Sequence, residues 1–255
     1  MKILAVDTSA LTASAALAFD GKLTGLYTLN AAHTHSETLL PMVESLLSNL
    51  KITVDDLDML AVTDGPGSFT GIRIGISLIK GLAFGKNIPC VGVSTLEALA
   101  QNAASVLKPG ELAVPVMDAR RSQLYNAVFV KNDDGSLTRL CDDRQIPVSE
   151  LESELANFPK TLQLPEPPPR SILFTGDGYQ LLRKSITAPL NIIETPETLK
   201  FQNAYSVALC AERKYLTAAD KSIFTDSAIK PIYLRAPQAE RERLEREAKS
   251  EQNQK

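Results

Sequence analysis

The chain has 255 residues, of which 44% are hydrophobic and 22% are charged, and its formal net charge is −3. This length and apolar content can bury a large core, which fits one large domain or two compact halves, and we favour two halves. The weakly acidic net charge predicts no extended basic surface that would bind nucleic acid without a partner. Any RNA contact is therefore expected to be local or shared with a partner.

The three cysteines, Cys90, Cys141 and Cys210, lie far apart and outside any C-x-x-C motif. They indicate neither a disulfide framework nor a zinc site, and they suit a reducing cytoplasm. No apolar stretch approaches the roughly 18 residues needed to cross a bilayer. Asp7 also interrupts the first apolar run too early for a signal peptide. We therefore expect a cytoplasmic protein without a membrane span.

The first part of the chain alternates short apolar runs with helical segments. Asp20 and Gly21 form a typical hairpin turn between two of these runs. From Ser36, a suitable helix cap that Glu37 follows in the first turn, leucines recur at the spacing of an amphipathic helix. In chain order we predict strands 3–6, 14–19 and 23–29, helix 36–50, strand 59–63, helix 69–84, strand 89–93 and a helix capped by Ser94. This order predicts a mixed sheet with helices packed on it.

After residues 108–110 the pattern restarts, which marks the beginning of a second half. Its predicted elements are strands 112–117, 124–131 and 137–148, helix 149–158 and strand 172–175. Four prolines between residues 165 and 169 predict an exposed loop, because proline removes backbone donors. We expect a helix at 205–216 to return to the first half, and the charged segment 238–255 to be disordered.

Glycines recur through the segment GPGSFTGIRIGISLIKGLAFG, residues 65–85. On a helix, Gly67, Gly71 and Gly75 share one face. Each glycine inside a helix costs about 1 kcal/mol relative to alanine, so several together indicate that something approaches the helix backbone closely. Internal packing, phosphate binding at the helix start and partner docking all stay open at this point. The spacing matches neither G-x-x-x-x-G-K-[ST] nor G-x-G-x-x-G, which disfavours a nucleotide site.

Several motifs resemble those of one known family and together span nearly the whole chain. They are AVDTS at 5–9, HTHSETLLP at 33–41, TDGPGSFTGIRIGISLIKGLAFG at 63–85, STLEALA at 94–100, MDARRSQLY at 117–125 and PIYLRAPQAE at 231–240. On these motifs the chain is identified as a member of the TsaB (YeaZ) family, and the glycine segment is the most specific of them.

The resemblance implies the fold of the actin-like ATPase superfamily, also called ASKHA or ribonuclease H-like. We therefore expect an α/β protein of two halves, each a mixed sheet with flanking helices. An N-terminal actin-like half at 1–109 is completed by the returning helix at about 200–220. A smaller, degenerate second half is expected at 110–199, before the tail at 238–255.

The resemblance also implies a function in the synthesis of N6-threonylcarbamoyladenosine in tRNA. Members of the family pair with a catalytic paralogue, TsaD, which would transfer the threonylcarbamoyl group to adenosine. This chain is then expected to be a non-catalytic scaffold or activator subunit that enables TsaE and tRNA to engage. Alone, it could pair with a second copy of itself as a homodimer. Arg120 and Arg121 are candidate contacts to tRNA.

The docking surface for TsaD is expected on the helix at 36–50 and on the glycine-lined helix that follows. The predicted interface residues are Leu39, Val43, Leu46, Gly67, Phe69, Gly71, Ile72, Gly75 and Ile76. The alternative is that most of the leucines face the protein's own sheet. Under the docking hypothesis, a large charged residue at Gly71 or Val43 should abolish co-purification with TsaD and leave the chain folded.

No catalytic residue and no metal site are predicted. The metal-binding H-x-x-x-H motif of TsaD falls here on Thr95 and Leu99, which cannot replace two imidazoles. His33 and His35 are the only histidines of the chain. Beyond Glu37 the sequence offers no clear third metal ligand beside them. We therefore interpret the two histidines as capping or polar surface contacts rather than as metal ligands.

A degenerate nucleotide site is a second, weaker prediction. Its candidate residues are Asp7, Thr8 and Ser9 in a first turn, Asp118 in a second, and Gly176 and Gly178 in a loop that could be the remnant of an adenosine site. The bulky side chains after Asp118 are expected to obstruct a phosphate. We predict no tightly bound cofactor and weak or no ATP turnover by the isolated chain, with ATP or ADP at an interface shared with TsaD left open.

Three other functions remain as alternatives. An ATP-binding enzyme of the kinase or ATPase type would need an intact phosphate turn, which the sequence lacks. A peptidase-like protein acting on its paralogue is favoured only by the adjacent His35 and Ser36, without a G-x-S-x-G elbow or an H-E-x-x-H helix. A free-standing regulator that associates with itself through the same helices is the third.

Overall fold

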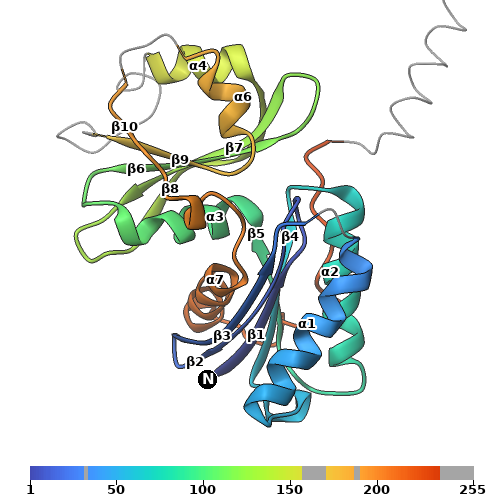
Figure 1. The fold of residues 1–255 in the computed structure, drawn as a ribbon. Helices are drawn as coiled ribbons and strands as arrows, with labels where there is room; N and C mark the ends of the chain where they lie inside the picture. Colours follow the sequence, from blue (N-terminus) through green and yellow to red (C-terminus); the bar gives the residue numbers. More distant parts are fainter. Residues whose placement is uncertain (32–33, 157–170, 187–189, 236–255) are drawn as a thin grey trace, which may run out of the picture.

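The computed structural model of the chain describes residues 1–31, 34–156, 171–186 and 190–235. The predicted proline loop at 165–169, the tail at 238–255 and His33 lie outside these residues. Figure 1 shows two halves, one above the other, each built on a twisted sheet with helices against it.

The first half is built on a mixed sheet of five strands in the order β3-β2-β1-β4-β5. The strands are β1 (Lys2–Asp7), β2 (Ala13–Phe19), β3 (Lys22–Leu29), β4 (Met59–Gly65) and β5 (Cys90–Ser94). Strands β1, β2 and β3 pair antiparallel, whereas β4 pairs parallel with both β1 and β5. The predicted hairpin between β2 and β3 is confirmed, and both turn residues, Asp20 and Gly21, have positive φ.

Helices cover both faces of this first sheet because its central strands are apolar on both sides. On one face α1 (His35–Leu50) and α2 (Phe69–Ala83) pack with Leu4, Val6 and Val62 in one core. On the other face α7 (Ala204–Thr217), the predicted returning helix, packs with Ile3 and Ala5 in a second core. Alternate residues of one strand thus enter opposite cores, as the period of a strand requires.

The second half repeats the topology of the first. Its sheet has the order β10-β9-β6-β7-β8, which from the other edge corresponds strand for strand to β3-β2-β1-β4-β5. The strands are β6 (Leu112–Asp118), β7 (Gln123–Lys131), β8 (Leu137–Pro147), β9 (Ile172–Thr175) and β10 (Ile192–Ile193). Helices α4 (Val148–Ala156) and α6 (Tyr179–Arg183) pack on its outer face. The predicted fold class, two halves with one mixed sheet each, is therefore confirmed.

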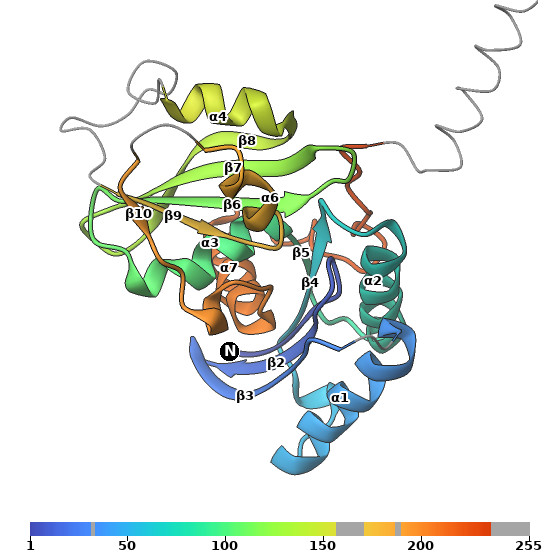
Figure 2. The same cartoon turned by 45° about the horizontal axis from the view of Figure 1, so that its top comes forward.

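Helix α3 (Thr95–Ala103) lies between the two sheets, next to α7 (Figure 2). Leu96 and Leu99 of α3 are fully buried and pack with Ala113, Phe129 and Leu173 of the second half. Short 3-10 turns complete the fold: η1 (Val54–Asp56), η2 (Ala104–Val106) and η3 (Glu197–Leu199). Helix α3 thus joins the halves through an apolar contact.

Candidate functional site

The glycine segment is tied to the turn between β1 and β2. Ser68 caps α2, since its Oγ accepts a hydrogen bond of 3.2 Å from the backbone N–H of Gly71. The backbone N–H of Ser68 donates to the carbonyl of Ser9 at 2.7 Å. The hydroxyl of Thr8 donates to the carbonyl of Gly71, also at 2.7 Å. The start of α2 is therefore fixed against the chain's own first turn.

The shared glycine face of α2 makes the same contact. A Cβ atom added at Gly71 would lie 2.0 Å from the carbonyl oxygen of Thr8, and one at Gly67 would lie 2.3 Å from that of Ser9. At Gly75 it would lie 2.8 Å from the Thr8 hydroxyl. The close backbone approach that the glycines indicate is thus internal packing, which was one of the three interpretations of the sequence.

This packing corrects most of the predicted interface residues. The inner faces of α1 and α2 lie on the sheet, so their side chains cannot contact a partner directly. The predicted interface residues that are buried in this way are Leu39, Val43, Leu46, Gly71, Ile72, Gly75 and Ile76. Substitution by a charged residue at Gly71 or Val43 would therefore disturb the fold rather than report on docking.

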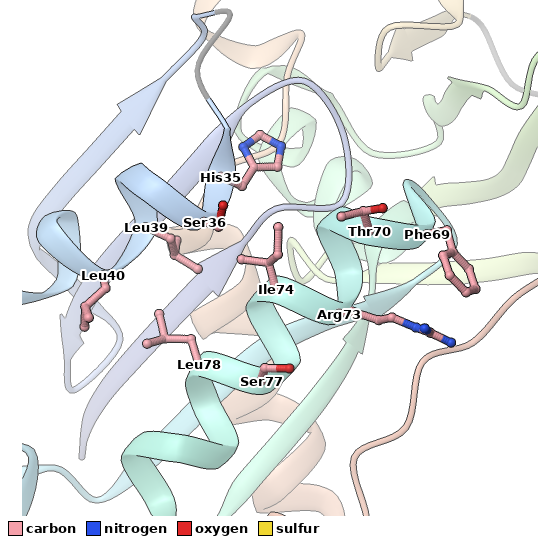
Figure 3. Close-up of a pocket in the computed structure, with 10 residues that line it drawn as sticks. All are labelled: His35, Ser36, Leu39, Leu40, Phe69, Thr70, Arg73, Ile74, Ser77 and Leu78. Atoms are coloured by element: carbon pink, nitrogen blue, oxygen red, sulfur yellow. The ribbon is translucent and has the colours of Figure 1, made fainter.

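The outer faces of α1 and α2 enclose a groove of about 470 Å³ (Figure 3). Leu39 and Leu40 of α1 and Ile74 and Leu78 of α2 project into the space between the helices. The groove is lined by His35, Ser36, Leu39, Leu40, Phe69, Thr70, Arg73, Ile74, Ser77 and Leu78. Of the predicted interface residues, Leu39 and Phe69 belong to this lining, and Gly67 lines a different cavity.

His35 begins α1 and lines the groove at the end where α1 and α2 both start. Its Nε2 donates to the carbonyl of Ala10 at 2.7 Å, so the interpretation of His35 as a polar contact holds. The helix starts one residue earlier than predicted, because Thr34 and not Ser36 is its N-cap residue. Ser36 instead lies in the first turn, where it lines the groove.

Phe69 and Arg73 line the same end of the groove, and both contact Tyr233, a residue from beyond α7. The Arg73 guanidinium lies 3.9 Å from the centroid of the Phe69 ring. Its Nε donates to the Tyr233 hydroxyl at 2.8 Å, and the Phe69 and Tyr233 rings stack at 4.8 Å between centroids. Sequence reasoning missed Tyr233 as a site residue. The motif PIYLRAPQAE, which contains it, was the signal that could have found it.

A second cavity, of about 370 Å³, lies between the two halves. The turn between β1 and β2, the start of α2, the turn between β6 and β7, and residues 233–235 all line it. Of the residues predicted for a degenerate nucleotide site, only Ser9 and Asp118 are in the lining. This cavity is called the cleft below.

The two glycines predicted to form an adenosine-side loop pack against β6 instead. A Cβ atom at Gly176 would lie 2.1 Å from the carbonyl oxygen of Val116, and one at Gly178 would lie 2.8 Å from the Met117 backbone. The N–H of Gly178 donates to the same Val116 carbonyl at 3.1 Å. These glycines therefore serve a close contact within the second half, which corrects their assignment to a nucleotide.

Asp7 and Thr8 also do not line the cleft. The carboxylate of Asp7 is fully buried and accepts hydrogen bonds of 2.8 Å from both the N–H and the hydroxyl of Ser9. This burial raises the pKa of Asp7. Oδ1 of Asp7 is thus bonded within the predicted first phosphate turn, whereas its Oδ2 is buried without a hydrogen-bond partner among the described residues.

The turn between β6 and β7 carries bulky residues in unusual backbone conformations. Arg120, Arg121 and Ser122 have φ angles of 65°, 54° and 56°, in the left-handed region that favours glycine. The Asp118 carboxylate accepts from the N–H of Arg120 at 2.7 Å, and the Asp177 carboxylate accepts from the N–H of Asp118 at 3.0 Å. The cleft is lined by two carboxylates, Asp118 and Asp177, and by two guanidinium groups, Arg120 and Arg235, so its charges balance. Nucleotide binding there stays an untested prediction.

The positions that correspond to the histidines of TsaD belong to the core. Thr95 and Leu99 are fully buried on α3, between the two sheets. Within the part of the chain that the structure describes, no three His, Cys, Asp or Glu side chains are grouped so that they could hold a metal ion. None of the described helices is long and apolar enough to cross a bilayer.

Comparison with known proteins identifies the family. The chain matches the family described as "TsaD: tRNA N6-adenosine threonylcarbamoyltransferase" over residues 19–243. It is 31% identical over 245 residues to the "tRNA threonylcarbamoyladenosine biosynthesis protein TsaB" of Bacillus subtilis, an alignment that covers 96% of this chain and 99% of that protein. The protein of the same name from Haemophilus influenzae is 40% identical over 131 residues, which span 51% of this chain and 55% of the relative.

A solved structure supports the fold. "YeaZ from Pseudomonas aeruginosa" is similar with a TM-score of 0.73 and 24% sequence identity, and the match covers 91% of this chain and 99% of that one. The fold expected from the sequence motifs is thereby confirmed. The full-length match to the Bacillus subtilis relative shows that the chain belongs to the TsaB family of tRNA threonylcarbamoyladenosine biosynthesis proteins.

Proposed function

We propose that the chain is a non-catalytic scaffold and activator subunit of threonylcarbamoyladenosine synthesis, which docks on the catalytic TsaD through the groove between α1 and α2. The observation that carries this proposal is the groove itself. The helices α1 and α2 leave this apolar groove open on their outer faces. The chain that carries it aligns with a TsaB protein over almost its whole length.

The chemistry of the groove suits a helix from another protein. Leu40 is 43% exposed, and the half-buried side chains of Ile74 and Leu78 flank it. Removing such aliphatic surface from water contributes about 25 cal/mol per Å². His35 of α1 and Arg73 of α2 add polar groups beside the apolar side chains, and these fix orientation, as in complexes where an apolar helix face lies in a groove.

The choice of TsaD as occupant follows from the likeness between the two proteins. This chain matches the TsaD family over residues 19–243, so both partners are expected to carry a corresponding pair of helices. Two such pairs can meet around a pseudo-twofold axis, with each pair packing against the other. The same geometry allows a homodimer of this chain when TsaD is absent.

In this account the group transfer belongs to TsaD, which would transfer the threonylcarbamoyl group from its adenylate to adenosine in tRNA. The contribution of this chain is to stabilise the active arrangement of TsaD and to offer a joint surface to TsaE and tRNA. The burial of Thr95 and Leu99 in the core supports this division, because these positions carry packing side chains where TsaD carries metal ligands.

Docking is tested with a pair of leucines. Leu40→Glu places a charge in the groove and should lower the affinity for purified TsaD at least about tenfold, because the carboxylate would be desolvated on binding. Leu216→Glu is the matched control, since Leu216 is 60% exposed on α7 and lines neither the groove nor the cleft. Isothermal titration calorimetry measures both affinities. If Leu40→Glu binds TsaD as tightly as the control, the groove is not the docking surface.

A further inference from the structure

The segment 229–235, called the strap below, crosses from the first half to the second (Figure 1). Ile229 is buried in the core beneath α2. The N–H of Ile232 donates to the carbonyl of Asp64, at the end of β4, at 2.7 Å. Nη1 of Arg235 then donates to the carbonyl of Ala119 in the second half. The strap is thus fixed to both halves, on the side of the molecule where α2 begins.

The end of β4 leaves room for the strap. A Cβ atom at Gly65 would lie 2.2 Å from the carbonyl oxygen of Ile232, and Gly65 has a φ of 135°, which side-chain-bearing residues rarely adopt. The backbone of the strap therefore lies directly on this glycine. Both partners take part in this contact: Gly65 leaves room for the Ile232 carbonyl, and the Ile232 N–H donates to the carbonyl of Asp64.

One stack of three side chains joins the groove to the cleft. Phe69 lines both cavities, Arg73 lines only the groove and Tyr233 lines only the cleft. Tyr233 holds the other two, because its ring stacks on Phe69 and its hydroxyl accepts from Arg73. The wall between the two cavities is therefore shared, and it contains a residue of the strap.

We propose that the strap positions side chains of the docking surface, with Tyr233 and Arg235 as the positioning residues. Tyr233 fixes Phe69 and Arg73 at the end of the groove, and Arg235 holds Tyr233 there by tying the strap to Ala119. Because Tyr233 already holds the Arg73 side chain in one conformation, Arg73 loses less rotamer freedom when the partner binds. This inference rests on the proposed function. It predicts that the affinity for TsaD depends on the hydrogen bond between Arg235 and Ala119, even if neither residue contacts TsaD.

The test measures the affinity of full-length variants for purified TsaD. Tyr233→Phe keeps the stacked ring but removes the oxygen that accepts from Arg73, and should weaken binding about threefold to tenfold. Arg235→Ala should weaken binding by a similar factor, although Arg235 does not line the groove. Arg183→Ala is the control, since Arg183 is exposed on α6 and lines neither cavity. Melting temperatures of all variants show that they are folded.

A double-mutant cycle separates positioning from a general loss of stability. In an Arg73→Ala background the hydrogen bond from Arg73 to Tyr233 is already lost, so adding Arg235→Ala should cause a smaller loss of affinity than in the wild-type chain. Wild-type affinity of both single variants, or an equal loss from Arg235→Ala in both backgrounds, would overturn the inference. If Leu40→Glu still abolishes binding in that case, the docking proposal stands and only the strap fails. If the wild-type chain does not bind TsaD, the proposed function itself fails.

Discussion

At the scale of single residues, Asp64 is the most unusual titratable group near the strap. It ends β4 with a side chain that is only 8% exposed, and its Oδ2 lies so close to Gly92 that a Cβ there would approach it to 2.2 Å. Burial raises the pKa of Asp64 to about 6, with Asp143 and Glu97 adding to the rise and Lys214 opposing it. Between about pH 4 and pH 6 the folded chain therefore holds a proton on Asp64 that the unfolded chain releases.

This shift predicts a pH dependence of stability. Because the folded-state pKa lies above the ordinary value of 3.8, the contribution of Asp64 is fully present below about pH 4 and is lost as the pH rises through 6. About two pKa units correspond to roughly 3 kcal/mol. Urea unfolding between pH 4 and pH 7 should show that loss in the wild type and not in Asp64→Asn. The exposed Asp133→Asn is the control, and parallel curves for wild type and Asp64→Asn would contradict the assignment.

At the scale of elements, α2 shows both the strength and the limit of sequence reasoning. The spacing of its glycines correctly predicts a shared helical face and a close backbone approach. Both faces of the helix carry isoleucines, however, with Ile72 buried and Ile74 in the groove. Hydrophobicity therefore could not decide which face packs inside, and most of the residues predicted for the interface lie on the buried face.

Alanine substitutions of glycines in α2 can distinguish its packed face from its open face. Gly71→Ala forces a methyl group against the Thr8 carbonyl and should destabilise the chain by at least about 2 kcal/mol. Gly81→Ala has no neighbouring atom within 4 Å and should instead stabilise it by up to about 1 kcal/mol, through helix propensity. Chemical unfolding of both variants measures the difference. Equal effects would show that the glycine face is not packed as described.

Other elements were predictable because their signals are local. The turn at Asp20 and Gly21, the long strand β8 and the returning helix α7 all follow from short runs of sequence. The contact between Arg73 and Tyr233 joins residues 160 positions apart, and no periodicity connects them. The glycines at 176 and 178 could not be interpreted from sequence alone, because close packing on β6 demands the same residue type as the adenosine-side loop considered for them.

At the scale of the whole molecule, polar contacts on two sides add to the apolar contact of α3 between the halves. On one side, Glu97 of α3 pairs with Arg213 of α7 at 2.8 Å and with Arg139 of β8 at 3.6 Å. On the other side, the strap links the end of β4 to the turn between β6 and β7. The groove meets the second connection at Phe69, Arg73 and Tyr233, which relates partner docking to the arrangement of the halves.

The most direct test of the central claim is reconstitution of threonylcarbamoyladenosine on unmodified tRNA from purified TsaC, TsaD and TsaE, with and without this chain. We expect modified nucleoside only when the chain is present, and loss of product with Leu40→Glu but not with Leu216→Glu. Equal amounts of product with and without the chain would contradict its function as an activating subunit of TsaD.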